Sequence, residues 1–359
     1  MTIPLNLNDF EALAKPKLQE MVYGYYVSGS DEQVTLSDNR QAYNSIKLRP
    51  RMLAGVGQRD TSTRVLGQQL SSPVMIAPMG FMQLAHPDGE LAMARAAASR
   101  QIPMILSTAA NHTIEQVAGA SDGLKWFQLY VYKDRAVTQR LVERAEQAGY
   151  QALVLTVDVP VLGRREADIR TGFHLPDGLT MANLMGDEMA DIRHVVGDSG
   201  LNAYLKGLWD ANLDWSIIAW LKSITSMPIL VKGILRGDDT LLALDHGADG
   251  IIVSNHGGRQ LDTAPATIMV LQEIVDAVAG RADILLDGGI RRGTDIIKAL
   301  AIGAKAVLIG RPMMWALAYE GQAGVEYALD LILAELDNAM ALCGCPSIVE
   351  ITPDLLWKP

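Results

Sequence analysis

A base and a fixed cation lie close together in the stretch Ser-Asn-His-Gly-Gly-Arg-Gln-Leu-Asp at residues 254–262. Arg259 follows His256 by three residues, and the two glycines between them allow a tight turn that can aim both side chains into one space. Such a pair suits a substrate that carries both an acidic hydrogen and a carboxylate. Taken alone, the same spacing also fits a surface loop with an isolated histidine, so the surrounding elements must decide between these interpretations.

Eight short apolar runs recur from residue 74 onward, and the stretch at 254–262 follows the sixth of them. Each run has the length and composition of a buried strand, and helix-like segments alternate with the runs. The predicted strands are 74–77, 104–106, 126–129, 153–157, 229–231, 251–253, 284–286 and 307–309, and the predicted helices are 88–99, 113–117, 134–148, 214–223, 238–246, 266–278, 294–301 and 312–318. This alternation predicts an α/β protein, a (β/α)8 TIM barrel.

The chain is predicted to form one domain, 1–359, with additions before, within and after the barrel. Residues 1–72 form an N-terminal helical extension, with helices at about 8–26 and 35–43 and then an irregular connection. The barrel covers 73–320, and a long loop after strand 4, at about 163–213, is expected to form a lid over its mouth. Residues 321–359 form a C-terminal helix and tail.

Polar residues or glycines follow nearly every predicted strand, and a closed barrel brings all the strand ends onto one face. These residues are Pro78 and Met79, Ser107, Gln128 and Tyr130, Thr156 and Asp158, Lys232, Ser254, Asp287 with Gly288 and Gly289, and Gly310 with Arg311. We therefore expect one pocket lined from most strands. The glycines and Arg311 follow strands 7 and 8, where barrel enzymes bind a phosphate group.

The chain has neither a complete G-x-G-x-x-G nor a Walker sequence, which argues against a dinucleotide or ATP as ligand. The residues at the strand ends instead favour a mononucleotide with one phosphate. Ser107, Gln128, Thr156 and Lys232 together offer hydroxyl, amide and ammonium groups that match the hydrogen-bonding edge of a flavin. The alternative for Lys232 is a salt bridge to Asp158 or Asp287. A barrel isomerase or synthase that binds phosphate, or a flavin-binding protein without activity, would also fit part of this pattern.

Composition excludes several other classes of protein. The net charge of −10 and the pI of about 5.1 are unfavourable for nucleic acid or an anionic membrane as partner. The two cysteines, Cys343 and Cys345, are too few for a metal site, and no metal is predicted. No apolar run approaches the roughly 18 residues of a membrane span, and no leader peptide is recognisable, so a cytoplasmic location is expected.

The chain resembles the FMN-dependent L-2-hydroxy-acid oxidases, the family that includes glycolate oxidase and lactate oxidase, over nearly its whole length. The matching segments are 254–262, 128–130, 155–158, 230–233 and 287–293. The resemblance implies FMN as cofactor, held by Pro78, Met79, Ser107, Gln128, Thr156, Lys232, Ser254, Asp287, Gly288, Gly289, Arg291, Gly310 and Arg311. It further implies that His256 is the catalytic base, that Asp158 stabilises its protonated form, that Arg259 and Arg165 bind the substrate carboxylate with help from Tyr25, and that Tyr130 lies beside the substrate oxygen.

The resemblance also carries an expectation about the substrate. Plant glycolate oxidases have a tryptophan where this chain has Ala109 and a threonine where it has Met79, so more space is expected beside the substrate C2 carbon. L-lactate, oxidised to pyruvate while O2 is reduced to H2O2, is therefore expected in preference to glycolate. Side chains such as Leu205 could refill that space, and a dehydrogenase that uses another electron acceptor is the closest rival.

Two further expectations follow from the resemblance. The family usually forms homotetramers, so a homo-oligomer is expected. The remaining histidines, His86, His112, His174, His194 and His246, are expected at the surface or at helix ends.

Overall fold

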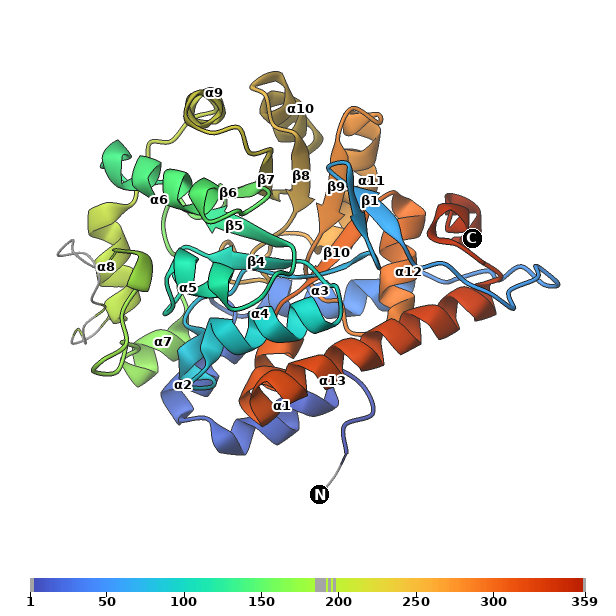
Figure 1. The fold of residues 1–359 in the computed structure, drawn as a ribbon, viewed down its shortest axis with the longest axis horizontal. Coiled ribbons are helices and arrows are strands. Elements are labelled where there is room, and N and C mark those ends of the chain that lie inside the picture. The colour runs from blue at the N-terminus through green and yellow to red at the C-terminus, as the bar shows by residue number, and fades with distance from the viewer. Residues whose placement is uncertain (1–2, 185–191, 193–194, 196–197, 358–359) are drawn as a thin grey trace.

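The computed structural model describes residues 3–184, 192, 195 and 198–357. Its centre is a closed barrel of eight parallel strands in the order β10-β3-β4-β5-β6-β7-β8-β9, with helices on the outside (Figure 1). The strands are β3 (Val74–Ile76), β4 (Met104–Ser107), β5 (Lys125–Leu129), β6 (Leu153–Thr156), β7 (Ile229–Ile234), β8 (Gly250–Val253), β9 (Asp283–Leu286) and β10 (Ala306–Ile309). The prediction of a (β/α)8 TIM barrel is confirmed.

The strand register sets polar residues beside one another at the carboxyl ends of neighbouring strands. Ser107 pairs with Gln128 across β4 and β5, and Thr156 pairs with Lys232 across β6 and β7. These four polar residues lie at or near the carboxyl ends of their strands, and each is at most 5% exposed. Polar residues that are far apart in the sequence therefore lie next to one another along one edge of the barrel.

The interior of the barrel is filled by its own small core. Its members come from most strands and include Trp126, Leu230 and Leu308, each at most 1% exposed. A larger core, separate from this one, lies between the outer faces of the strands and the surrounding helices. Because the interior is packed with side chains, the barrel offers space for a ligand only at its ends.

A hairpin that the sequence analysis did not predict closes the amino-terminal end of the barrel. Strands β1 (Thr63–Val65) and β2 (Gln68–Leu70) pair antiparallel within the segment that was expected to be irregular. Val65 and Leu70 pack into the interior core, and Asp283 accepts a hydrogen bond from the Leu66 amide. Three-residue strands give too short an alternating pattern to be recognised in a sequence. With this end closed, the carboxyl end is the open mouth.

The outer helices follow the strands as predicted, with small differences at their ends. They are α4 (Gly89–Ser99), α5 (Ile114–Gly119), α6 (Arg135–Gln147), α9 (Ser216–Ile224), α10 (Gly237–Asp245), α11 (Thr267–Val278), α12 (Gly293–Ile302) and α13 (Arg311–Cys343). The last of these runs on into the predicted C-terminal helix, but its backbone is non-helical at Glu320 and Gly321. This kink separates the helix that completes the barrel from the one that crosses its outside.

The prediction of a single helix at 8–26 is wrong. The structure contains α1 (Asp9–Ala14), the 3-10 helix η1 (Lys15–Lys17) and α2 (Glu20–Val27), and α3 (Val34–Ser45) follows. Pro16 lies at the start of η1, and Leu18 has an extended backbone, with φ −105° and ψ 143°. Proline lacks the amide hydrogen that a continuing helix needs, so the chain turns there and α2 takes its own direction. That direction brings Tyr25 and Tyr26 to the barrel mouth.

The long connection after β6 contains more regular structure than its sequence indicates. Its described part includes α7 (Glu166–Thr171), η3 (Ala182–Leu184) and α8 (Gly200–Leu208). The short elements that remain are η2 (Met82–Leu84), η4 (Ile348–Glu350) and η5 (Pro353–Leu355). Within the residues that the structure describes, no helix has the length and apolar character needed to cross a membrane.

The contact between α12 and α13 gives a test of the packing. A methyl group on Gly293 would lie 2.3 Å from the backbone carbon of Glu335, whereas one on Gly119, in α5, would meet nothing within 4 Å. We expect Gly293→Ala to destabilise the protein by roughly 1–3 kcal/mol, because the backbones of two packed helices must separate. Gly119→Ala should be neutral or stabilising by about 0.5–1 kcal/mol. Thermal unfolding of both variants checks this, and equal Tm values would contradict it.

Candidate active site

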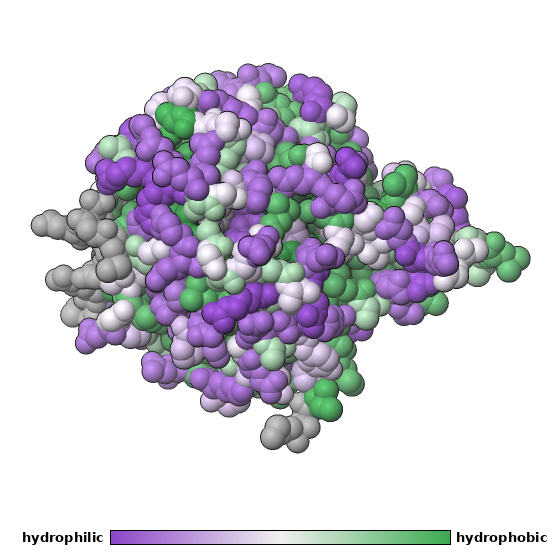
Figure 2. Space-filling model, viewed as in Figure 1, coloured by the Kyte–Doolittle hydropathy of each residue, from purple (hydrophilic) through white to green (hydrophobic). Residues whose placement is uncertain are grey.

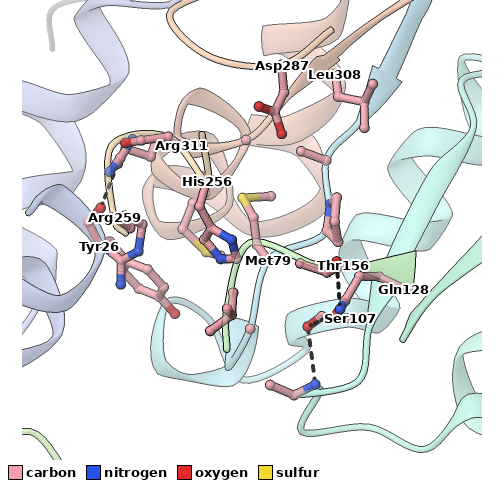
Figure 3. Close-up of a pocket in the computed structure, with 18 of the residues that line it drawn as sticks. Tyr26, Met79, Ser107, Gln128, Thr156, His256, Arg259, Asp287, Leu308 and Arg311 are labelled. Atoms are coloured by element: carbon pink, nitrogen blue, oxygen red, sulfur yellow. Dashed lines mark hydrogen bonds between the residues drawn. The ribbon is translucent and has the colours of Figure 1, made fainter. Parts of the chain in front are cut away.

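One pocket at the carboxyl ends of the barrel strands collects nearly all of the predicted site residues (Figure 3). Of those residues, only Asp158 and Ser254 do not line it, and each contacts a residue that does. The predicted residues that line the pocket are Tyr25, Pro78, Met79, Ser107, Ala109, Gln128, Tyr130, Thr156, Arg165, Lys232, His256, Arg259, Asp287, Gly288, Gly289, Arg291, Gly310 and Arg311. The barrel therefore brings together residues from most of the length of the chain.

His256 is held in a left-handed turn directly after β8. Its φ is 57°, and those of Gly257 and Gly258 are 65° and 76°. A side chain on Gly258 would lie 2.6 Å from the Leu36 amide nitrogen, so only glycine allows this close approach to α3. A positive φ is unusual for histidine and is typical of functional sites, where surrounding contacts maintain it. Here one such contact is the His256 amide, which donates to Ser254 Oγ at 3.1 Å.

The orientation of the imidazole is fixed by Asp158. His256 Nδ1 lies 2.9 Å from Asp158 Oδ1, so Nδ1 carries the proton that the carboxylate accepts. Nε2 is then the nitrogen that is available to the pocket. Because the two side chains follow different strands, β6 and β8, barrel closure is what makes this pair.

Burial sets the protonation of the pair. It lowers the pKa of His256, and the charge and hydrogen bond of Asp158 oppose only part of this effect. Burial alone would raise the pKa of Asp158, but His256 and Lys232 outweigh it and the pKa falls below its usual value. At neutral pH the pair is therefore a carboxylate next to a neutral imidazole, which is the state needed for a general base.

Three arginines, of which Arg165 is buried and Arg259 and Arg311 are partly buried, line the pocket with few carboxylates to balance them. Arg259 donates to the Tyr25 and Ser28 carbonyls and lies 4.9 Å from the centre of the Tyr25 ring. Arg165 is 5% exposed, and its nearest carboxylate is that of Asp168 at 3.9 Å. Burial and the charge of Arg259 lower the pKa of Arg165 to about 10. Buried cations without equal numbers of anions favour an anionic ligand.

Arg311 is the third of these arginines and lies where the predicted phosphate site is. It donates to the Tyr26, Gly257 and Ser28 carbonyls, so its guanidinium is fixed at the beginning of α13. Burial, followed by the charges of the neighbouring arginines, lowers the pKa of Arg311. Together with the helix N-terminus, it makes this end of the pocket positive.

Gly288 and Gly289 complete the phosphate end. Their φ values are 96° and 82°, and a side chain on Gly289 would lie 1.7 Å from the Asn39 carbonyl oxygen. The backbone can therefore line the pocket closely only because both residues are glycine. Arg291 follows on the same loop and also lines the pocket, with its pKa lowered to about 10 by burial and by Arg40. Two arginines and glycine-rich backbone match the chemistry of a phosphate group.

A line of hydrogen bonds runs along the strand ends away from the phosphate end. Ser107 Oγ donates to Gln128 Oε1 at 3.2 Å, and Gln128 Nε2 donates to Thr156 Oγ1 at 3.0 Å. Figure 3 shows these three side chains at the same edge of the pocket. They form a neutral polar edge with donors and acceptors in alternation, as the planar ring of a flavin requires.

Lys232 ends this polar edge with a charge. Its ammonium donates to Ser254 Oγ at 2.9 Å and lies 3.1 Å from Asp287 Oδ2, so the predicted salt bridge to Asp287 forms as well. Burial would lower the pKa of Lys232, but Asp287 and Asp158 raise it above its usual value. The lysine is therefore a permanent cation. Among the described residues, Asp287 Oδ1 has no hydrogen-bond partner, so this wall still offers a buried acceptor to a ligand.

Aromatic and apolar side chains form the opposite wall. Tyr130 stacks on Trp209 with ring centres 4.2 Å apart, and burial raises its pKa, so the phenol keeps its proton. Tyr25 stacks on Phe173 at the same distance. Met79 and Ala109 also line the pocket.

The sequence analysis missed several residues of that wall. The pocket is also lined by Tyr26, Phe81, Leu162, Met181, Leu201 and Trp209. Phe81 could have been found, because it lies only a few residues beyond the end of β3. The residues from the long connection could not have been found in this way, because they are far from any strand end in the sequence. The side chain of Leu205 lies outside the described part of the protein.

His112 directly precedes Thr113, the N-cap of α5, so it lies at a helix end as expected, but it is not a surface residue. His112 is 9% exposed and pairs with the fully buried Glu90, with 2.7 Å between Nδ1 and Oε2. His246 caps the end of α10 as expected, and His194 lies outside the described residues.

Comparison with known proteins identifies the family. The model of the FMN-dependent dehydrogenases matches residues 14–358. The chain belongs to this family. It is 53% identical over 357 residues to the L-lactate oxidase of Nostoc sp., with 98% of each chain covered. It is 52% identical over 347 residues to the glycolate oxidase of Spinacia oleracea, with 97% of this chain and 94% of the relative covered.

Solved structures of family members have the same architecture. Mandelate oxidase with (S)-4-hydroxymandelic acid has a TM-score of 0.94, at 40% identity, and 99% of this chain and 98% of that chain are covered. An active chimera of (S)-mandelate dehydrogenase has a TM-score of 0.92, at 39% identity, with 99% of each chain covered. The family cofactor, FMN, fits the residues present, because the phosphate end, the neutral polar edge and the lysine follow one another along the pocket in the order of its parts.

The first prediction from this geometry concerns His256. We expect His256→Gln to lower the rate of flavin reduction by a 2-hydroxy acid roughly 10²–10⁴-fold, because glutamine cannot accept the proton. FMN binding should not change, since no cofactor contact is assigned to the imidazole. Anaerobic stopped-flow measurement of flavin bleaching tests this, and an unchanged rate would remove the assigned role.

The second prediction concerns the pH dependence set by Asp158. In Asp158→Asn the neighbouring charge that raises the pKa of His256 is lost, so this pKa falls further below its usual value. The acidic limb of the kcat/KM profile should therefore move to lower pH. The plateau should fall about tenfold for each 1.4 kcal/mol of lost imidazolium stabilisation. An acidic limb that moves to higher pH would contradict this account.

Proposed function

We propose that this chain is an FMN-dependent L-2-hydroxy-acid oxidase whose preferred substrate is L-lactate, which it oxidises to pyruvate while O2 is reduced to H2O2. The observation that carries the proposal is the His256–Asp158 pair, which faces the same pocket as Arg259 and Arg165. A base and two cations around one cavity suit a substrate with a hydroxyl group and an adjacent carboxylate.

The proposed roles follow from the geometry of each side chain. Arg259 and Arg165 bind the substrate carboxylate, and the Tyr25 hydroxyl adds a hydrogen bond. His256 Nε2 accepts a proton from the substrate as it is oxidised, and the Asp158 carboxylate stabilises the imidazolium that results. Tyr130 remains protonated and donates to the substrate oxygen as charge develops on it.

The cofactor site is proposed in the same terms. FMN supplies a two-electron acceptor that can pass the electrons to O2. Lys232 would lie beside the pyrimidine part of the ring, with Ser107, Gln128 and Thr156 along that edge. Arg291, Arg311, Gly289 and Gly310 would hold the phosphate. Pro78, Met79, Ser254, Asp287 and Gly288 complete the predicted set.

Two observations bear on the choice among 2-hydroxy acids. The identities to the lactate oxidase and the glycolate oxidase, 53% and 52%, are too close to decide. The pocket wall is more informative, because Ala109 leaves room for a methyl group on C2 and Met79 provides a flexible apolar surface beside it. This favours lactate over glycolate.

The acceptor, the assembly and the location are further parts of the proposal. Relatives include both oxidases and a dehydrogenase, and we propose O2 because the long loop carries no apolar or basic insertion. We propose a homotetramer, and exposed apolar side chains fit an interface between subunits: Met52 is 72% exposed and Leu53 is 105% exposed. Figure 2 shows an arm that projects from the body of the molecule and ends in apolar residues. The two cysteines are free, as expected in the cytoplasm. Light scattering would show the tetramer.

The experiment that tests the oxidase is direct. The purified protein should be yellow, L-lactate should bleach it without oxygen, and air should restore the colour with formation of H2O2. A barrel isomerase would have no flavin spectrum, and a dehydrogenase would be bleached but would recover only with an artificial acceptor. A protein that binds FMN but is not bleached by any 2-hydroxy acid would refute the proposed function.

The substrate preference gives a separate prediction. One buried methyl group contributes about 1–3 kcal/mol, so kcat/KM for L-lactate should exceed that for glycolate roughly 10–200-fold. Ala109→Trp should reverse or abolish the difference, because the indole fills the space that the methyl group occupies. Steady-state rates with L-lactate, D-lactate and glycolate measure this. Equal efficiencies for L-lactate and glycolate would contradict the lactate assignment and leave the oxidase assignment intact.

A further inference from the structure

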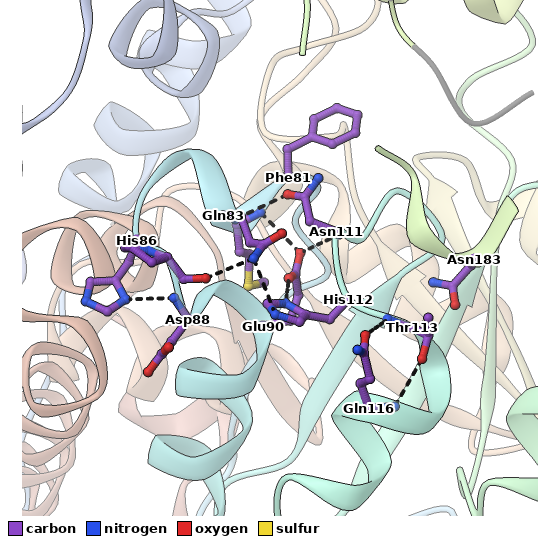
Figure 4. Close-up of polar contacts among 12 residues, drawn as sticks. Phe81, Gln83, His86, Asp88, Glu90, Asn111, His112, Thr113, Gln116 and Asn183 are labelled. Atoms are coloured by element: carbon purple, nitrogen blue, oxygen red, sulfur yellow. Dashed lines mark hydrogen bonds and ion pairs between the residues drawn. The ribbon is translucent and has the colours of Figure 1, made fainter. Parts of the chain in front are cut away.

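A buried polar cluster lies directly behind the apolar wall of the pocket and takes no part in the chemistry described above. It consists of Glu90, Asn111 and His112, which are 0%, 9% and 9% exposed (Figure 4). Glu90 is in the first turn of α4, and the other two lie in the loop between β4 and α5. Burial of a carboxylate, an imidazole and an amide in one place is unfavourable unless the hydrogen bonds among them are complete.

The carboxylate of Glu90 is at the centre of the cluster. Its Oε1 accepts from the amides of Met82 at 3.2 Å and Asn111 at 3.0 Å, and its Oε2 lies 2.7 Å from His112 Nδ1. With its proton on Nδ1, the imidazole donates to the carboxylate, and Nε2 faces the side-chain amide of Gln83 at 3.4 Å. One carboxylate thus connects the loop after β3 to the loop after β4.

Asn111 extends the connection to the long segment after β6. Its Oδ1 accepts from the Gln83 amide at 3.2 Å, and its Nδ2 donates to the Thr180 carbonyl at 2.9 Å. The Ala182 amide donates to the Ala110 carbonyl at 3.0 Å beside it. The cluster therefore holds three segments that are far apart in the sequence.

Each of these segments contributes to the apolar wall. The loop after β3 carries Met79 and Phe81, and the loop after β4 carries Ala109. The long segment carries Met181, which lies between Thr180, bonded to Asn111, and Ala182, bonded to Ala110. The Phe81 amide donates to the Ala109 carbonyl at 2.9 Å, so the first two loops move together. Apolar side chains cannot fix their own position by hydrogen bonds, so the spacing of the wall depends on these backbone hydrogen bonds and on the polar cluster behind them.

We propose that Glu90, Asn111 and His112 are positioning residues that set the width of the wall facing the substrate C2 substituent, and so determine discrimination by substituent size. The inference rests on the proposed function only in the choice of 2-hydroxy acids as substrates. None of the three side chains lines the pocket, so each acts through the loops that it holds.

His112→Leu is the main test, since it removes the donor to Glu90 but keeps a similar volume. We expect the preference for L-lactate over glycolate to fall roughly three- to tenfold, a part of the 10–200-fold that one methyl contact provides. The loss should appear in KM for L-lactate, with kcat changed less than about twofold, because His256 and the arginines are not moved. Efficiency with L-2-hydroxy acids that have longer side chains should rise relative to L-lactate.

Two variants serve as controls. Asn can place its amide nitrogen where Nδ1 of histidine lies, so His112→Asn should restore the preference. Thr113→Ala removes the capping box with Gln116 at the start of α5, next to the cluster, without touching Glu90. It should lower the Tm and leave the substrate preference unchanged. If His112→Leu lowers the Tm in the same way and keeps the preference within twofold, the cluster is only structural and the proposal is wrong.

Two further measurements separate the possible failures. If His112→Leu does not fold, Asn111→Ala tests the connection to Thr180, again by the preference for L-lactate over glycolate. Binding of inert carboxylates, acetate against phenylacetate, to the wild-type and variant holoprotein can be followed by the flavin spectrum without turnover. A protein that oxidises no 2-hydroxy acid refutes the proposed function. Even then, a changed ratio of the dissociation constants for acetate and phenylacetate supports the positioning role of the cluster, and an unchanged ratio overturns it.

Discussion

Closure of the parallel barrel is the constraint on which the rest of this structure depends. Eight strands pair into a closed barrel without an edge, and because all eight run parallel, their carboxyl ends meet at one mouth. The hairpin β1–β2 and the packed interior close the other end. His256 and Asp158, which follow β8 and β6, become partners through this closure, not through any local preference of the chain.

The second constraint is charge at that mouth. Arg165 is buried and Arg259, Arg291 and Arg311 are partly buried, with few carboxylates near them, whereas Lys232 has Asp287 as a close partner. An unbalanced set of buried cations costs folding free energy and is stabilised by anions that bind there. The molecule thus has two anion-binding ends around one neutral polar edge, and this arrangement matches a phosphate-bearing flavin next to a carboxylate substrate.

Selectivity depends on a different kind of residue. In the proposed binding mode, the charged groups recognise what all 2-hydroxy acids share, and only the apolar wall contacts the part in which they differ. Met79, Phe81, Ala109 and Met181 of that wall come from three segments, and the Glu90 cluster behind them supplies polar contacts that connect these segments. Chemistry and selectivity are therefore separable here, because different elements of the fold carry them.

The sequence by itself determined the barrel, its eight strands and the residues at their ends, because strand periodicity and the polar residue that follows each run are local properties. It also identified His256, Arg259 and Lys232, because a base and two cations can be recognised from the residue type alone. Tertiary structure decided what local patterns do not encode. Pro16 divides the expected helix at 8–26, three-residue strands close the barrel, and Met181 and Trp209 reach the pocket from a segment without a strand end. The burial of His112 was also decided by the tertiary structure, because its hydrogen-bond partner, the carboxylate of Glu90, is distant in the sequence.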